Sequence, residues 1–186
     1  MRVRLSPNGD GIQVMIYTKD QDDLFARICN FFDRMAYSIV EAKIYTTQHG
    51  YALNSFSVLD QSGKSVSYSG LLKFIEIELT EKISANNIEA PLEGRISRQV
   101  KHTLFNTQVS IHVEQQQHMI EIVAADRPGL LAKIAFIFLQ MGIDLHNAKI
   151  NTLGNRAEDR FLVSGKLGTA LQTAQLSLLR EELARL

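Results

Sequence analysis

The pattern of hydrophobic and polar positions divides the first half of the chain into short strands and two helices. Alternating apolar and polar residues mark half-buried strands, and a cluster of turn formers over 6–11 joins the first two in a predicted β-hairpin. Apolar side chains three and four residues apart mark helices, the first of which follows the capping segment Asp20–Asp23. In chain order, we predict strands over 2–5 and 12–16, a helix with its apolar face from Leu24 to Met35, strands over 39–47 and 51–59, and, after a polar loop over 60–70, a helix over 71–85.

The second half of the chain repeats this order after a segment that contains turn formers and several basic residues. Pro91 and Gly94 lie in that segment, which predicts a linker over 86–106 with helical character near 99–104. We therefore expect a first domain over 1–85 and a second over 107–186. The elements predicted in the second domain are strands over 107–113 and 119–123, a helix over 129–141, strands over 145–152 and 157–164, and a helix over 170–186.

The two halves align residue by residue at a constant offset, which indicates an internal repeat. After a one-residue shift in one turn, the alignment continues to the end of the fourth strand of each half. The aligned pairs include Asp20 with Asp126, Leu24 with Leu130, Phe32 with Phe138, Ala42 with Ala148, and, after the shift, Phe56 with Phe161. Most matched positions are of the core type, so they predict two copies of one fold but not two copies of one site.

Each copy has the order strand, strand, helix, strand, strand, helix, which predicts an α+β class fold. Two helices would cover one face of a four-stranded antiparallel sheet. We expect the leading strand of each copy, Arg2–Leu5 or Thr107–Val113, to fill the edge of its own sheet, because the short hairpin turn makes it a neighbour of the next strand. The alternative is that Thr107–Val113 is the last strand of the first copy.

The turn from Ala124 to Leu131 joins a predicted strand to a predicted helix. Asp126 is a suitable helix cap or near-cap, Pro128 fits a first helical turn, and Gly129 lets the backbone approach another group closely. Such a turn leaves backbone N–H groups unpaired, and a carboxylate could bind there. The alternative interpretation is a well-capped helix and nothing more.

Composition and charge narrow the classes of function. The 186 residues include 20 basic and 20 acidic side chains, whereas a nucleic-acid or anionic-membrane surface normally shows a basic excess. The single cysteine, Cys29, lies in a helical apolar pattern and is expected in the core. No apolar run reaches the length of a membrane span, so we expect a soluble, cytoplasmic protein with neither a membrane nor a nucleic-acid partner. The five histidines are scattered, and we expect no metal site.

The segments Asp126–Leu131, Met141–Leu145 and Ala148–Ile150 resemble the ACT domain, a ferredoxin-like module that binds amino acids. The tandem pair further resembles the C-terminal part of the bacterial bifunctional uridylyltransferase/uridylyl-removing enzymes, which modify the nitrogen-signalling protein PII. The segments that carry this narrower resemblance are Ile16–Thr18 before Asp20, Gly50-Tyr51 before Val58–Gln61, and Arg156–Asp159 after Ala148–Ile150. The resemblance covers essentially the whole chain.

This resemblance implies that the chain is a regulatory fragment and catalyses nothing itself. Nucleotidyltransferase and hydrolase domains, with their magnesium, would lie elsewhere in the parent protein, and no motif of either domain is found here. The partners that the resemblance implies are those catalytic domains, PII through the full-length enzyme, and glutamine as the sensed signal of nitrogen status. The fragment could also form a homodimer.

A bound amino acid would place its carboxylate on the backbone N–H groups of Gly129, Leu130 and Leu131, and Arg127 could add positive charge. Its ammonium would need an acidic or carbonyl partner. The candidates for this ammonium and for a side-chain amide are Asp126, Asp144 and Asn147, the last of which could instead face solvent.

The first copy departs from this pattern, because Asp22-Asp23 replace Pro128-Gly129 and Ser38 replaces Asp144. Carboxylates at a helix start repel a bound carboxylate, so we expect the main site in the second copy. A weaker secondary site would comprise Asp20, Gln21, Asp23 and Ser38. If the two sheets pair side by side, a ligand could be shared at their seam. The competing hypothesis is a module that mediates dimerisation or interdomain contact without a ligand.

Overall fold

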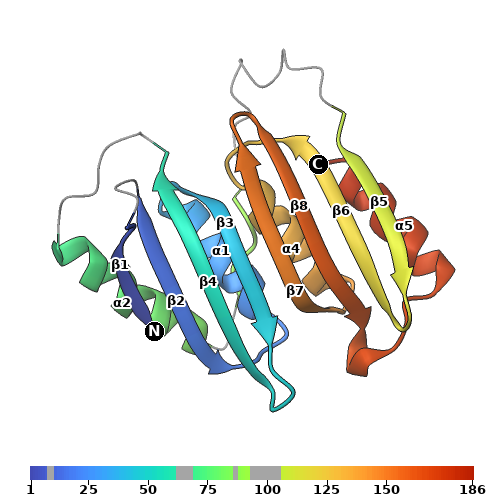
Figure 1. Ribbon diagram of the computed structural model, residues 1–186, viewed down its shortest axis with the longest axis horizontal. Coiled ribbons are helices and arrows are strands. Elements are labelled where there is room, and N and C mark those ends of the chain that lie inside the picture. The colour runs from blue at the N-terminus through green and yellow to red at the C-terminus, as the bar shows by residue number, and fades with distance from the viewer. Residues whose placement is uncertain (8–10, 62–68, 86–87, 93–105) are drawn as a thin grey trace.

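The computed structural model describes residues 1–7, 11–61, 69–85, 88–92 and 106–186 (Figure 1). Most of the predicted linker lies outside the described residues, and so do its predicted helical part near 99–104 and most of the polar loop over 60–70.

The observed helices and strands follow the predicted order in both copies. The strands and helices of the first copy are β1 (Arg2–Leu5), β2 (Ile12–Lys19), α1 (Leu24–Arg34), β3 (Tyr37–Thr46), β4 (Tyr51–Asp60) and α2 (Ser69–Ser84). Those of the second copy are β5 (Gln108–Glu114), β6 (Gln117–Ala125), α4 (Leu130–Gln140), β7 (Ile143–Leu153), β8 (Arg156–Gly165) and α5 (Thr173–Ala184), with a short 3-10 helix, η1 (Lys166–Gly168), before α5. The last helix therefore begins three residues later than predicted, because η1 and an extended segment precede it.

The strands form one continuous antiparallel sheet in the order β1-β2-β4-β3-β7-β8-β6-β5. The leading strand of each copy occupies an outer edge, where β1 pairs with β2 and β5 pairs with β6. This confirms the predicted α+β fold of two four-stranded units. The alternative assignment of Thr107–Val113 to the first copy is wrong, because β5 pairs with β6 of its own copy at the far edge of the sheet.

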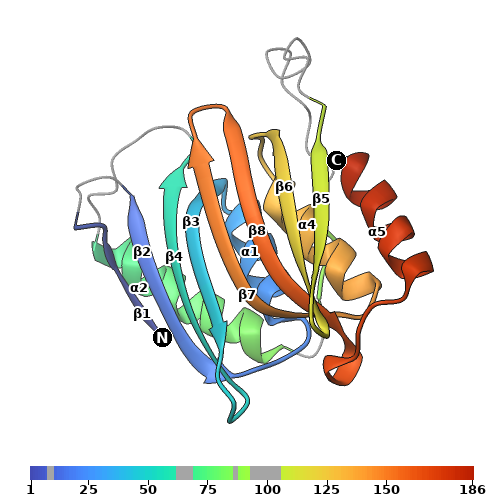
Figure 2. The same ribbon diagram turned by 45° about the vertical axis from the view of Figure 1, so that its right-hand side comes forward.

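The two copies meet where β3 pairs with β7, and we call this junction the seam. Ala42 lies opposite Ile150 and Ile44 lies opposite Ala148, so small side chains face larger ones across it. The four α-helices that the structure describes cover the same face of the sheet, with α1 and α4 side by side over the seam (Figures 1 and 2). Phe25 of α1 packs edge-on against Phe161 of β8, with ring centroids 6.3 Å apart. The hydrophobic core is therefore continuous between the copies.

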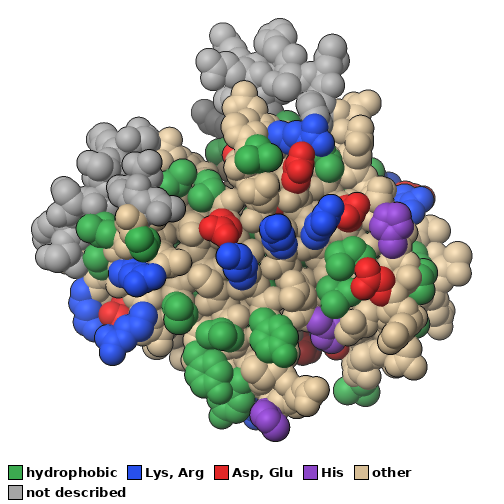
Figure 3. Space-filling view, viewed as in Figure 1, with side chains coloured by type: hydrophobic (Ala, Val, Ile, Leu, Met, Phe, Trp, Pro, Cys, Tyr) green, Lys and Arg blue, Asp and Glu red, His purple; other side chains and the backbone are tan. Residues whose placement is uncertain are grey.

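The residues that face the helices form this core. Phe32, Phe56 and Phe161 are fully buried, and Cys29 is buried among the apolar side chains as predicted. The opposite face of the sheet carries exposed side chains, among them a row of charged residues (Figure 3). The helices leave that face of the sheet open. The pockets that form the candidate site lie instead at the ends of strands and at the seam.

Candidate functional site

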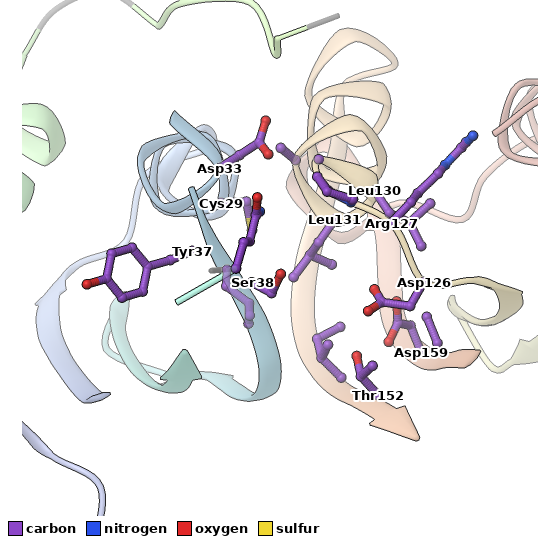
Figure 4. Close-up of a pocket in the computed structure, with 17 residues that line it drawn as sticks. Cys29, Asp33, Tyr37, Ser38, Asp126, Arg127, Leu130, Leu131, Thr152 and Asp159 are labelled. Carbon is purple, nitrogen blue, oxygen red and sulfur yellow. The ribbon is translucent and has the colours of Figure 1, made fainter. Parts of the chain in front are cut away.

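Two hollows lie at the seam, and each is built from both copies. The first, the α4 pocket, lies between the loop 126–129 before α4 and Ser38 and Ile39 of β3 (Figure 4). The second, the α1 pocket, lies between Asp20–Asp22 before α1 and Asp144–His146 of β7. Each copy thus contributes its helix-start loop to one pocket and its seam strand to the other.

This exchange separates residues that the sequence interpretation grouped together. Asp144 lies in the α1 pocket with Asp20 and Gln21, not beside Asp126, and Ser38 lies in the α4 pocket. The prediction that Asp126 and Asp144 lie in one site is therefore wrong. The antiparallel pairing of β3 with β7 places the start of each of these strands beside the helix-start loop of the other copy. Asn147 is exposed on β7 opposite Tyr45 and lines neither of these pockets.

Backbone hydrogen bonds hold the loop before α4 in place. The amide N–H of Asp126 donates to the carbonyl of Asn155, 2.9 Å away, and that of Leu130 donates to the carbonyl of Arg127 at 3.2 Å. The N-cap position is Gly129, with a left-handed φ of 75° and no side-chain cap hydrogen bond. Asp126 is therefore not the helix cap that the sequence suggested, and its carboxylate is turned into the pocket instead (Figure 4).

Asp159 is the residue of this pocket that sequence reasoning missed. It lies on β8 with only 3% of its surface exposed, and its carboxylate points toward that of Asp126 (Figure 4). The backbone N–H of Asn151 donates to its Oδ1 at 3.4 Å. Alternation along β8 was the available signal, because Asp159 shares the inward face with Ala157 and Phe161.

Burial dominates the electrostatics of these two carboxyl groups. Burial raises the pKa of Asp159 to about 7, the Asn151 N–H lowers it in part, and the charge of Asp126 raises it further. Burial also raises the pKa of Asp126, partly offset by a hydrogen bond from the Arg127 backbone. Neither carboxylate has an ion-pair partner among the described residues. The pocket is thus suited to a positively charged group.

A third carboxylate lies close to the position predicted for a ligand carboxylate. Asp33, at the end of α1, approaches Gly129 so closely that an added β-carbon would be 3.1 Å from its Oδ2. Burial raises the pKa of Asp33, while the charges of Lys133 and Arg34 lower it. Arg127 lines the same pocket but extends away from Asp126 and Asp159 (Figure 4). A second anion at the start of α4 would therefore meet the charge of Asp33.

The α1 pocket has a different set of polar contacts. Asp20 accepts hydrogen bonds from the Gln21 backbone at 3.0 Å and from the Thr46 hydroxyl at 3.1 Å. The ammonium of Lys166 bridges Asp22 at 2.7 Å and Asp144 at 2.8 Å. Asp23, expected in the secondary site, instead pairs with Arg27 one helical turn along α1 and does not line the pocket. The expected grouping of Asp23 and Ser38 with Asp20 is thus wrong in its geometry.

The described residues contain no group of three or more histidine, cysteine or acidic side chains placed to hold a metal ion. Among the helices that the structure describes, none is long and apolar enough to cross a membrane.

The fold and its repeat define a tandem pair of ACT domains. Residues 118–179 match the sequence profile of the ACT domain, and the first copy repeats the same strand and helix order. The second copy thus matches the ACT-domain family.

More particularly, nearly the whole chain is similar to one part of the bifunctional uridylyltransferase/uridylyl-removing enzymes. It is 45% identical to that of Nitrosospira multiformis over 90% of this chain and 19% of the relative. It is 43% identical to that of Chromobacterium violaceum over 97% of this chain and 22% of the relative. The enzyme of Aromatoleum aromaticum is also 43% identical, over 100% of this chain and 22% of the relative. The chain therefore spans about a fifth of the length of these relatives.

Proposed function

We propose that this chain is the amino-acid-sensing part of a bifunctional uridylyltransferase/uridylyl-removing enzyme, and that glutamine is its ligand. The observation that supports this most directly is the pair of polar pockets at the seam, each lined by both copies. The similarity to relatives with that name supports the assignment to this class of enzyme.

Binding at the seam offers a physical route from ligand to regulation. The α4 pocket is lined by the loop 126–129 of one copy and by Ser38 and Asp33 of the other, so a ligand there would contact both. Its binding free energy would then favour one arrangement of the two copies over others. Catalytic domains that contact both copies would respond to that change.

We assign the catalytic activities in the names of the relatives to parts of the protein outside this chain. On this proposal, PII and magnesium bind to those parts, and the isolated chain neither adds UMP to PII nor removes it. An assay of both reactions with the purified chain tests this, and turnover of either kind would contradict it.

The direct test of ligand binding is calorimetry of the purified chain with glutamine, with glutamate and leucine as controls. Glutamate keeps the length but replaces the neutral side-chain amide by a carboxylate, and leucine removes side-chain hydrogen bonding. Saturable binding of glutamine alone is expected. Binding of none of the three would overturn the proposal and would favour a module for dimerisation or interdomain contact.

A further inference from the structure

The two seam pockets share one geometry but differ in charge at matched positions. The end of β8 aligns with the end of β4, so Asp159 corresponds to Asn54 and Lys166 corresponds to Gln61. Asp159 and Gln61 line the α4 pocket, whereas Asn54 lines the α1 pocket and Lys166 bridges two of its acidic groups. Three aspartates line each pocket, but at these matched positions the α4 pocket has a carboxylate and a neutral amide, whereas the α1 pocket has a neutral amide and two of its carboxylates pair with a lysine.

Two of the acidic groups of the α1 pocket already have an ammonium partner. Lys166 bridges Asp22 of the first copy and Asp144 of the second, so these two carboxylates share one positive charge across the seam. The carboxylate of Asp20 accepts hydrogen bonds from the Gln21 backbone N–H and from the Thr46 hydroxyl. A free amino acid would have to displace Lys166 from two ion pairs to place its own ammonium there.

In the α4 pocket the one cationic side chain among the described lining residues, Arg127, extends away from Asp126 and Asp159 (Figure 4). Asp126 and Asp159 face each other, and Asp159 is almost completely buried (Figure 4). Neither has a positively charged partner within ion-pair distance among the described residues. A buried carboxylate beside a half-buried one is costly unless a proton or a cation lies between them. A ligand ammonium would supply both the charge and the hydrogen-bond donors.

We propose that the α4 pocket binds the ammonium group of a free amino acid between Asp126 and Asp159, and that the α1 pocket, with Lys166 in place, binds none. This inference rests on the proposed function and deepens it, because it names the recognised group, the residue Asp159 and a stoichiometry of one ligand per chain. The α-ammonium is common to all amino acids, so discrimination between them is left to the other side chains of the pocket.

The test compares glutamine with its deaminated analogue, glutaramic acid, which keeps the carboxylate and the side-chain amide. Calorimetry of the whole chain is expected to give one glutamine per chain and at least about tenfold weaker binding of the analogue, the loss expected when a charged hydrogen bond is removed. Asp159→Asn is expected to weaken glutamine by a similar factor and to leave the analogue's affinity within about threefold. The variant should fold, because Asn54 occupies the matched buried position in the first copy.

The matched control is Asn54→Asp, which places the extra carboxylate in the α1 pocket and should leave binding at the α4 pocket within about threefold. If wild type binds glutamine but Asp159→Asn binds it equally well, or if the analogue binds as tightly as glutamine, this inference is wrong while the proposed function stands. Two equivalent glutamine sites per chain would also overturn it. If wild type binds no amino acid, both proposals fail together.

Discussion

The carboxylate of Asp33, at the end of α1, lies against Gly129 at the start of α4, and a β-carbon at Gly129 would come within 3.1 Å of its Oδ2. The first copy thus supplies an anion to the helix N-terminus of the second, where the helix dipole favours negative charge. Gly129 has a φ of 75°, whereas the aligned Asp23 has a φ of −104°. The two positions are therefore not interchangeable, although they align in sequence.

Gly129→Ala is expected to lower the free energy of unfolding by more than its backbone strain alone. A left-handed conformation costs a non-glycine residue about 1–2 kcal/mol, and the contact with Asp33 adds to that cost. Gly50→Ala is the matched control, because Gly50 has a φ of 72° and no atom within 4 Å of its added β-carbon. Urea denaturation measures both losses. Equal losses, or no recovery when Asp33→Ala is added to Gly129→Ala, would show that the contact is energetically neutral.

The free energy of unfolding is expected to fall as the pH rises from about 4 to about 7. The pKa of Asp159 is about 7 in the folded protein against an ordinary value of 3.8, so the folded state binds more protons than the unfolded state across this interval. Ionisation therefore costs the folded state stability, and the loss is complete above the folded pKa. Thermal melting between pH 4.5 and pH 8 measures this slope.

Asp159→Asn should flatten that slope and should raise the melting temperature at pH 8, because a buried ionised group is removed. The reciprocal variant, Asn54→Asp, should steepen the slope, since Asn54 is only 1% exposed. Identical pH profiles for wild type and Asp159→Asn would mean that Asp159 is ionised in the folded state without a cost.

The fold could be predicted from the sequence because its determinants are local. Alternation along β2 and β6, and the helical spacing of Leu24, Ile28 and Phe32, are set by residues close together in the chain. The hairpin turn likewise fixed β1 beside β2. Because the two copies align in sequence, the helices and strands predicted in one copy could also be predicted in the other.

The candidate site could be predicted only in part, because the seam is a long-range contact. The loop at Asp126 and the N–H groups at the start of α4 were found from local turn chemistry. The partners of that loop, Ser38 and Asp33, come from the other copy through the pairing of β3 with β7, which no local pattern specifies. Asp144 was assigned to the wrong loop for the same reason.

Deleting residues 1–5 should speed amide hydrogen exchange in β2. In the structure β1 pairs with β2 over its whole length, with Val3 opposite Val14, and β2 would become an open edge without it. Exchange in β6, which lies six strands away from β1 in the sheet order, provides the internal control and should not change. Unchanged protection of the β2 amides would show that the β1 pairing does not persist in solution.

Gln61→Lys should abolish amino-acid binding by supplying an internal competitor. Gln61 lines the α4 pocket and corresponds to Lys166, whose ammonium bridges two carboxylates in the α1 pocket. An ammonium at position 61 would enter a pocket in which Asp126 and Asp159 have no ion-pair partner among the described residues, and it would occupy the place proposed for the ligand. Glutamine affinity should fall at least about tenfold. The melting temperature at pH 8 should rise, because an opposite charge offsets the cost of ionising Asp159.

Lys166→Gln is the matched control, because it removes the cation from the α1 pocket and gives that position the side chain found in the first copy. Its ion pairs are partly exposed, so the loss of stability should stay below about 1 kcal/mol. Glutamine binding at the α4 pocket should not change, whereas a second, weaker site is expected once Asp22 and Asp144 are left without their lysine. Calorimetry of the two variants side by side separates the pockets. Weaker glutamine binding in Lys166→Gln but not in Gln61→Lys would place the ligand in the α1 pocket and would reverse the assignment.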